Sequence, residues 1–192
     1  MHKKILLAAL GCAVITMASR ADERLLYYSG FNEAWTTTGS NYDAAPVTQV
    51  TDFSNEEFTF SFENVRIVTD GTTVQENTKN PVPDMTVGYL MSNKSEATIT
   101  LSALKSITRI VYNHSATGDK RGWGMKVSVD GGASWDIVYD TPITSNARAG
   151  VKVEVDVTAK LAELGKQVGD AGVMLQFYNM KPVGGIKLIK DL

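Results

Sequence analysis

The chain has 192 residues, of which 43% are hydrophobic, 21% charged and 8% aromatic, and its formal net charge is −2. This ordinary composition excludes collagen-like and wholly disordered chains, and the length suits a single domain. A surface that binds duplex nucleic acid usually carries a basic excess, so no nucleic-acid partner is expected. One cysteine and two histidines are too few for a zinc, iron–sulfur or thiol-based site.

Residues 1–21 have the pattern of a secretory signal peptide. Two early lysines precede an apolar run over residues 5–18, and small residues follow up to Ala21. The run is shorter than the ~20 residues that span a bilayer, so no transmembrane segment is expected after processing. Cleavage after Ala18 and cleavage after Ala21 both fit. We therefore expect an exported protein, periplasmic, surface-bound or secreted, with one domain over residues 22–192.

Cys12 lies inside the apolar run and raises the alternative of a lipid anchor. Residues 9–11 (Ala-Leu-Gly) are a poor approach to a lipidated cysteine, and apolar residues continue beyond Cys12 to Ala18. Signal removal is therefore preferred over anchoring. The mature chain then has no cysteine, and its hydrophobic core alone must hold the fold in an oxidising compartment.

Hydrophobic and polar residues alternate along several segments, which is typical of strands with one face in a core. The clearest are residues 58–62, 123–129, 151–157 and 173–177. Further candidates of the same character are residues 25–28, 65–69, 87–91, 97–101, 107–113, 134–139 and 185–189. About ten or eleven strands at this spacing predict an all-β fold of antiparallel sheets, a sandwich or a barrel.

One short stretch predicts a helix. Thr158 can act as its N-cap, Leu161 and Leu164 recur on one side, and Gly165 can end it. Strands and helices do not alternate elsewhere in the chain. A parallel sheet around a nucleotide site is therefore not expected.

Residues 128–135 (Ser-Val-Asp-Gly-Gly-Ala-Ser-Trp) fit the pattern Ser-x-Asp-x-Gly-x-Ser/Thr-Trp and resemble an Asp-box. Asp130 can accept hydrogen bonds from turn amides, and Gly131 or Gly132 can adopt a positive φ. Trp135 begins the return strand, where its indole can pack beneath the hairpin. A propeller needs at least four blades, so one copy indicates a hairpin device. We interpret Asp130 and Trp135 as fold residues.

Five segments, in this order, carry a wider resemblance. They are residues 25–35 (LLYYSGFNEAW), 88–101 (GYLMSNKSEATITL), 107–123 (ITRIVYNHSATGDKRGW), the hairpin at 128–135, and 173–191 (VMLQFYNMKPVGGIKLIKD). The set is similar to secreted jelly-roll, galactose-binding-like modules of Bacteroidetes, found alone or beside pectate-lyase-like β-helices. The resemblance implies a two-sheet antiparallel jelly-roll sandwich with one short helix, which often recognises carbohydrate. It also implies a possible structural calcium ion, for which the sequence designates no ligand.

A sugar offers hydroxyls and an apolar ring face, so its site needs exposed aromatic rings and planar hydrogen-bonding side chains. The segment around residues 114–123 supplies His114, Arg121 and Trp123. Each has a structural alternative. Trp123 shares a strand face with core residues, His114 can be a hydrogen-bonded structural histidine, and Arg121 can be a solvated loop charge.

Two other places supply the same residue types. Trp35 and Tyr42 flank a polar loop after the first predicted strand, where Trp35 can stack on a sugar or plug one end of the sandwich. Tyr178, with Gln176 and Asn179, is placed opposite the core face of the strand at 173–177. It forms part of a binding strip if that face is open, and of a second packing layer if a loop covers it.

Catalytic patterns are weak in this chain. No Gly-x-Ser-x-Gly elbow accompanies a histidine, and His114 is the one histidine outside the signal peptide. Facing carboxylates are a matter of geometry that spacing does not reveal. The sequence therefore favours a non-catalytic glycan-binding protein without a cofactor. The alternatives are a structural or adhesive surface protein with a protein partner, and a small polysaccharide lyase or glycoside hydrolase.

Overall fold

The computed structural model describes residues 25–29, 31, 35, 42–52, 54–69, 88–105, 107–116, 121–143, 150–181, 187–190 and 192. The predicted signal peptide and Cys12 lie outside these ranges. Within them, no helix combines the length and apolar character that a membrane crossing requires.

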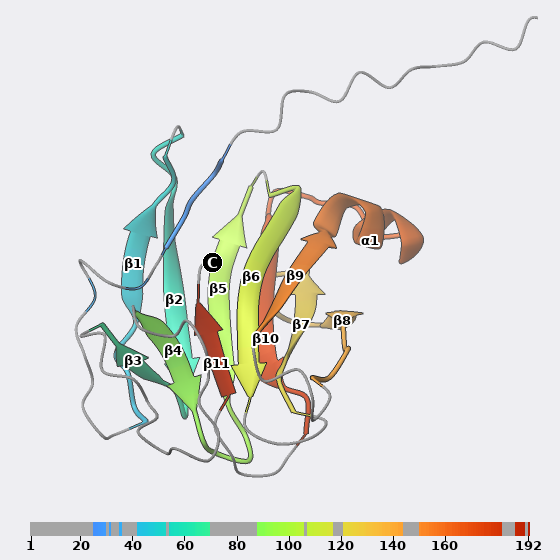
Figure 1. Cartoon of the computed structure of the whole chain (residues 1–192). Coiled ribbons are helices and arrows are strands. Elements are labelled where there is room, and N and C mark those ends of the chain that lie inside the picture. The colour runs from blue at the N-terminus through green and yellow to red at the C-terminus, as the bar shows by residue number, and fades with distance from the viewer. Residues whose placement is uncertain are drawn as a thin grey trace, which may run out of the picture.

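Two antiparallel sheets form the fold, and they lie as two layers in Figure 1. In sheet order, the six-stranded sheet consists of β1 (Val47–Val50), β2 (Glu57–Glu63), β5 (Thr98–Leu104), β10 (Val173–Asn179), β7 (Trp123–Ser128) and β8 (Asp136–Tyr139). The five-stranded sheet consists of β3 (Arg66–Val68), β4 (Tyr89–Ser92), β11 (Lys187–Lys190), β6 (Arg109–Ala116) and β9 (Val151–Asp156). The all-β prediction is confirmed.

The strand order is that of a jelly roll. Counting from β4, the chain builds one four-stranded unit in the order β4-β11-β6-β9 and a second in the order β5-β10-β7-β8. In each unit a strand from late in the chain lies between two earlier strands. β11 lies between β4 and β6, and β10 between β5 and β7, as in two interlocked Greek keys. Strands β2 and β1 extend the second unit beyond β5, and β3 extends the first beyond β4.

The core fills the space between the two sheets. Inward-facing residues alternate along each strand, so Leu175 and Phe177 of β10 are fully buried together with Met125 and Val127 of β7. Tyr112 of β6 meets Phe177 edge-on across the layers, with ring centroids 4.9 Å apart. Each such side chain contributes about 1.5–3 kcal/mol through burial, which replaces the missing disulfides.

Two local predictions need correction, and residues 47–50, for which no element was predicted, form the edge strand β1. Residues 25–28 are not a strand, although Ser29 exchanges two backbone hydrogen bonds with Leu192 and so joins the two ends of the fold. Asp156, not Thr158, caps helix α1 (Val157–Glu163), because its carboxylate accepts from the Ala159 amide at 2.8 Å.

Helix α1 lies at one end of the sandwich, after β9 (Figure 1). Leu161 is buried, whereas Leu164, expected on the same face, is 39% exposed. Leu164 follows the last helical turn and so leaves the packed side. Gly165 ends the helix with φ +66°, as predicted.

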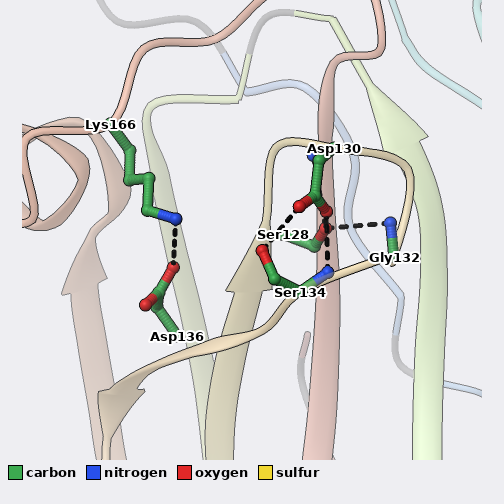
Figure 2. A network of polar contacts seen from close by, with 6 residues as sticks. All are labelled: Ser128, Asp130, Gly132, Ser134, Asp136 and Lys166. Carbon is green, nitrogen blue, oxygen red and sulfur yellow. Dashed lines mark hydrogen bonds and ion pairs between the residues drawn. The ribbon is translucent and has the colours of Figure 1, made fainter.

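The β7–β8 hairpin is tied together by Asp130 (Figure 2). Its carboxylate accepts hydrogen bonds from the Ser134 amide at 2.9 Å and the Ser128 hydroxyl at 2.7 Å, and from the Ser134 hydroxyl. These bonds hold the pKa of Asp130 well below its usual range. The turn residues Gly131 and Gly132 have φ of +71° and +91°, values that favour glycine. Asp130 thus has the structural hydrogen-bonding role that the turn chemistry predicts.

Candidate functional site

Trp123 is completely buried at the start of β7. Its amide donates to Nδ1 of His114 at 3.2 Å, and its carbonyl accepts from the Tyr112 hydroxyl at 3.2 Å. Two side chains of β6 therefore hold the backbone of one β7 residue across the two sheets. This position corrects the interpretation of Trp123 as a sugar platform, because an indole with no exposed surface offers no face to a ligand.

His114 is also fully buried, between the rings of Tyr112 and Tyr139. Burial lowers its pKa to about 4, so the imidazole is neutral at pH 7. Nδ1 accepts from the Trp123 amide, which leaves the proton on Nε2. The structure therefore corrects the candidate ligand contact to a structural histidine that joins the two layers.

Trp35 and Tyr42 do not lie together. Trp35 is 6% exposed and packs edge-on against Phe31 and Phe60, so it plugs the core and presents no platform. Tyr42 packs against the apolar cluster on the outer side of the five-stranded sheet, with Lys94 Nζ 5.3 Å from its ring centroid. Burial raises the pKa of the Tyr42 phenol, and Arg66 opposes the rise.

Arg121 is half-buried just before β7, where its carbonyl accepts from the Ile143 amide at 2.8 Å. The three predicted places do not form one site, although Asn179 of the third is the register partner of Trp123 of the first. Tyr178 lies on the outer face of the six-stranded sheet, and the strands on both sides of it are described, so a binding surface can be built around it.

The ring of Tyr178 lies across Gly124 of the neighbouring strand. The two residues are register partners, and a Cβ built on Gly124 would come within 2.5–2.7 Å of the ring and hydroxyl atoms. The absence of a side chain at Gly124 lets the ring lie down on the sheet. The hydroxyl donates to Asp140 Oδ1 at 2.8 Å, which fixes the other end of the ring.

Tyr178 stays a neutral hydrogen-bond donor at physiological pH. Burial is the main cause that raises its pKa, and the Asp140 carboxylate adds to the effect by accepting its hydrogen and opposing a second negative charge. Lys126 Nζ lies 4.7 Å from the ring centroid. The site therefore presents a half-buried aromatic ring that lies on Gly124, is held by Asp140 through its hydroxyl, and has the Lys126 ammonium group over it.

A row of mostly polar side chains crosses the sheet beside this ring. Pairing places Lys126 of β7 next to Gln176 of β10, and Gln176 next to Thr100 of β5. The Gln176 amide donates to the Thr100 hydroxyl at 3.1 Å, which leaves the Gln176 carbonyl oxygen as an acceptor. Ser61 of β2 continues the row, and Ile137 of β8 ends it on the other side. We call Tyr178 and this row the Tyr178 surface.

The Tyr178 surface offers a flat ring, an amide and hydroxyls, but no arrangement of a nucleophile with a base. Among the described residues, no group of three or more His, Cys, Asp or Glu side chains is placed to hold a metal ion. The calcium ion implied by the resemblance stays a prediction.

Comparison with protein-family models finds no match, and comparison with curated proteins finds none either. Solved structures with a related arrangement include TmCBM61, a carbohydrate-binding module in complex with beta-1,4-galactotriose, at 13% identity and TM-score 0.40. That match covers 70% of this chain and 84% of the module. Another is the K2 cleaved adhesin domain of Lys-gingipain, at 12% identity and TM-score 0.45, covering 77% and 96%. Both TM-scores are low, and the fold assignment follows from the strand order itself.

Sequence reasoning named Tyr178 and Gln176 but missed Gly124, Lys126 and Asp140. The alternation of side chains along a strand places Lys126 on the face opposite Met125, but it does not identify the neighbours of Lys126 on the next strands. Which residue of β7 lies opposite Tyr178 depends on the pairing register between strands about fifty residues apart in the chain. Such long-range register has no local sequence signal.

Proposed function

We propose that this protein is an exported, non-catalytic glycan-binding module that binds its ligand on the Tyr178 surface. The observation that carries the proposal is the ring of Tyr178, laid flat over Gly124 and held through its hydroxyl by Asp140. A sugar stacks through its C–H face on such a ring, and the cost of ordering the ring is already met in the free protein.

The surroundings of the ring suit hydroxyl recognition. Gln176 supplies an amide oxygen, and Thr100 and Ser61 supply hydroxyls along the same row. A row across four neighbouring strands is about 15 Å long, since strands lie roughly 4.8 Å apart. An extended saccharide can therefore contact several partners at once, as weak polar contacts require.

A glycan array with the purified protein tests the proposal, followed by titration of the best ligand into two variants. Tyr178→Ala removes the platform and is expected to weaken binding about 10-fold or more, as for a central aromatic contact. Tyr28→Ala is the matched control, because Tyr28 is a 58% exposed tyrosine in the N-terminal segment, and it leaves binding unchanged. Equal effects of the two substitutions, or no binding to any glycan, would overturn the proposal.

A protein partner is the second candidate, and one observation favours it. Ile137 is 54% exposed on β8, an edge strand of the six-stranded sheet. Exposed edge strands accept further strands, and an apolar side chain there suits a protein surface. If the partner is a protein, Ile137→Ser should abolish adhesion to the immobilised partner and Tyr178→Ala should leave it unchanged. Glycan binding predicts that Tyr178→Ala has the larger effect.

A further inference from the structure

We infer that the Tyr178 surface selects an acidic saccharide, whose anionic group pairs with Lys126 while its ring lies on Tyr178. This inference rests on the proposed function and adds the class of ligand. It follows from where Lys126 lies and from the charges around it.

Lys126 lies next to the Tyr178 ring, within the same binding surface. Its Nζ lies 4.7 Å from the centroid of the Tyr178 ring, and its strand position is two residues from Gly124, on which that ring rests. A sugar seated on the ring therefore brings its substituents within reach of the ammonium group. An anionic substituent there gains a charge-assisted hydrogen bond, whereas a hydroxyl gains an ordinary one.

The residues beside Lys126 on the outer face do not neutralise it. Its register partners are Gln176 and Ile137, which carry no charge. Beyond Gln176 the row continues with Thr100 and Ser61, also uncharged. Asp140 is the nearby carboxylate, and its Oδ1 accepts from the Tyr178 hydroxyl.

Several basic side chains of the described ranges have carboxylate partners. Lys160 pairs with Glu163 at 2.7 Å and Lys166 with Asp136 at 3.2 Å, and Arg109 pairs with Glu154. Among the residues that the structure describes, Lys126 has no such ion pair, and its contact is with the Tyr178 ring. An incoming anion therefore meets an ammonium group that has no ion-pair partner among the described residues, next to an uncharged row.

The test compares two oligosaccharides that differ in charge and in one methyl group per esterified residue. An oligomer of galacturonic acid and its full methyl ester are titrated into the protein by calorimetry at low and at physiological salt. We expect the acid to bind about 5- to 10-fold more tightly than the ester, as for a charge-assisted hydrogen bond, and the difference to shrink as salt screens it. A sulfated galactose oligomer distinguishes a sulfate ligand from a carboxylate.

Lys126→Met removes the charge and keeps an unbranched side chain that can lie on the ring. It should bind the acid and the ester equally, with the affinity for the ester unchanged. Lys152→Met is the matched control, because Lys152 is an exposed lysine on β9 of the other sheet, and it keeps the preference.

Each outcome decides the matter. Equal binding of acid and ester by the unmodified protein, still dependent on Tyr178, would overturn the acidic ligand and leave the glycan proposal standing. A preference that survives Lys126→Met would place the selecting cation elsewhere. No binding of acid, ester, sulfated or neutral oligomers would overturn both proposals.

Discussion

Trp123 and Tyr178 are aromatic residues on adjacent strands, yet they occupy opposite environments. Trp123 pairs with Asn179, the residue after Tyr178, and its side chain points into the core with no exposed surface. Tyr178 points outward across Gly124 and keeps a half-buried ring. One step along the strand therefore separates a residue that holds the two sheets together from one that can meet a ligand.

The inner and outer regions also use polar groups differently. Inside, His114 and Tyr112 direct their polar atoms at the backbone of Trp123, so that no buried main-chain group of that residue goes unpaired. Outside, Asp140 accepts a hydrogen bond from the Tyr178 hydroxyl, and the Lys126 ammonium group lies over the Tyr178 ring. A cluster of aromatic and basic residues in a sequence is therefore compatible with either role, and strand parity decides.

The largest effect is expected from Trp123→Ala in the inner region. Removing a fully buried indole should lower the free energy of unfolding by about 3–5 kcal/mol, through lost burial and the cavity left behind. Urea unfolding followed by circular dichroism measures it. A loss below about 1 kcal/mol would mean that the indole is not part of the core.

A pH-dependent loss of stability should come from His114. Its pKa is about 4 in the folded protein, below the ordinary value, so the unfolded chain binds the proton more readily between these pH values. His114 contributes about 3 kcal/mol to the free energy of unfolding in its neutral form. This contribution is fully present above pH 6.5 and is lost as the pH falls through 4.

Urea midpoints at pH 7 and pH 4 in the unmodified protein and in His114→Phe measure this contribution. The variant should be less stable at pH 7, because the Trp123 amide loses its acceptor, and should show a smaller drop toward pH 4. An identical pH dependence of both proteins would contradict the assignment.

The smallest effect on stability and a clear effect on binding are expected from Gly124→Ala in the outer region. The added methyl group would collide with the Tyr178 ring at 2.5–2.7 Å, and the ring, at the end of a side chain, can swing away into solvent. Because the clashing atoms are the far end of the Tyr178 side chain, stability should change by less than about 1 kcal/mol, while glycan affinity falls about 10-fold. Thermal melting and calorimetric titration on one sample separate the two effects, and unchanged affinity would show that the ring position does not matter.

Much of the fold can be predicted from the sequence because a strand with one buried face has alternating hydrophobic and polar residues. The alternations at residues 58–62, 151–157 and 173–177 mark strands with one buried face, and the structure places strands there. The chain composition cannot show which strands are neighbours. Short elements are harder to predict from the sequence. β1 has four residues, and both Asp156 and Thr158 have side chains that can cap a helix.

The site was harder to predict than the fold for a physical reason. Parity places Trp123 inward, but the two bonds that hold its backbone come from His114 and Tyr112 of the other sheet. The Tyr178 surface depends on Gly124 and Asp140, which meet Tyr178 through pairings far apart in the chain. Local patterns supplied candidate residues, and tertiary register selected among them.

The location of the binding surface can be measured directly by two-dimensional amide NMR during titration with the ligand found on the array. The largest shifts should fall on the side-chain amide of Gln176 and on the backbone of Lys126 and Tyr178, with little change at Trp123 or at Tyr42 on the other sheet. Shifts concentrated at Tyr42, or spread along helix α1, would contradict a ligand site on the outer face of the six-stranded sheet.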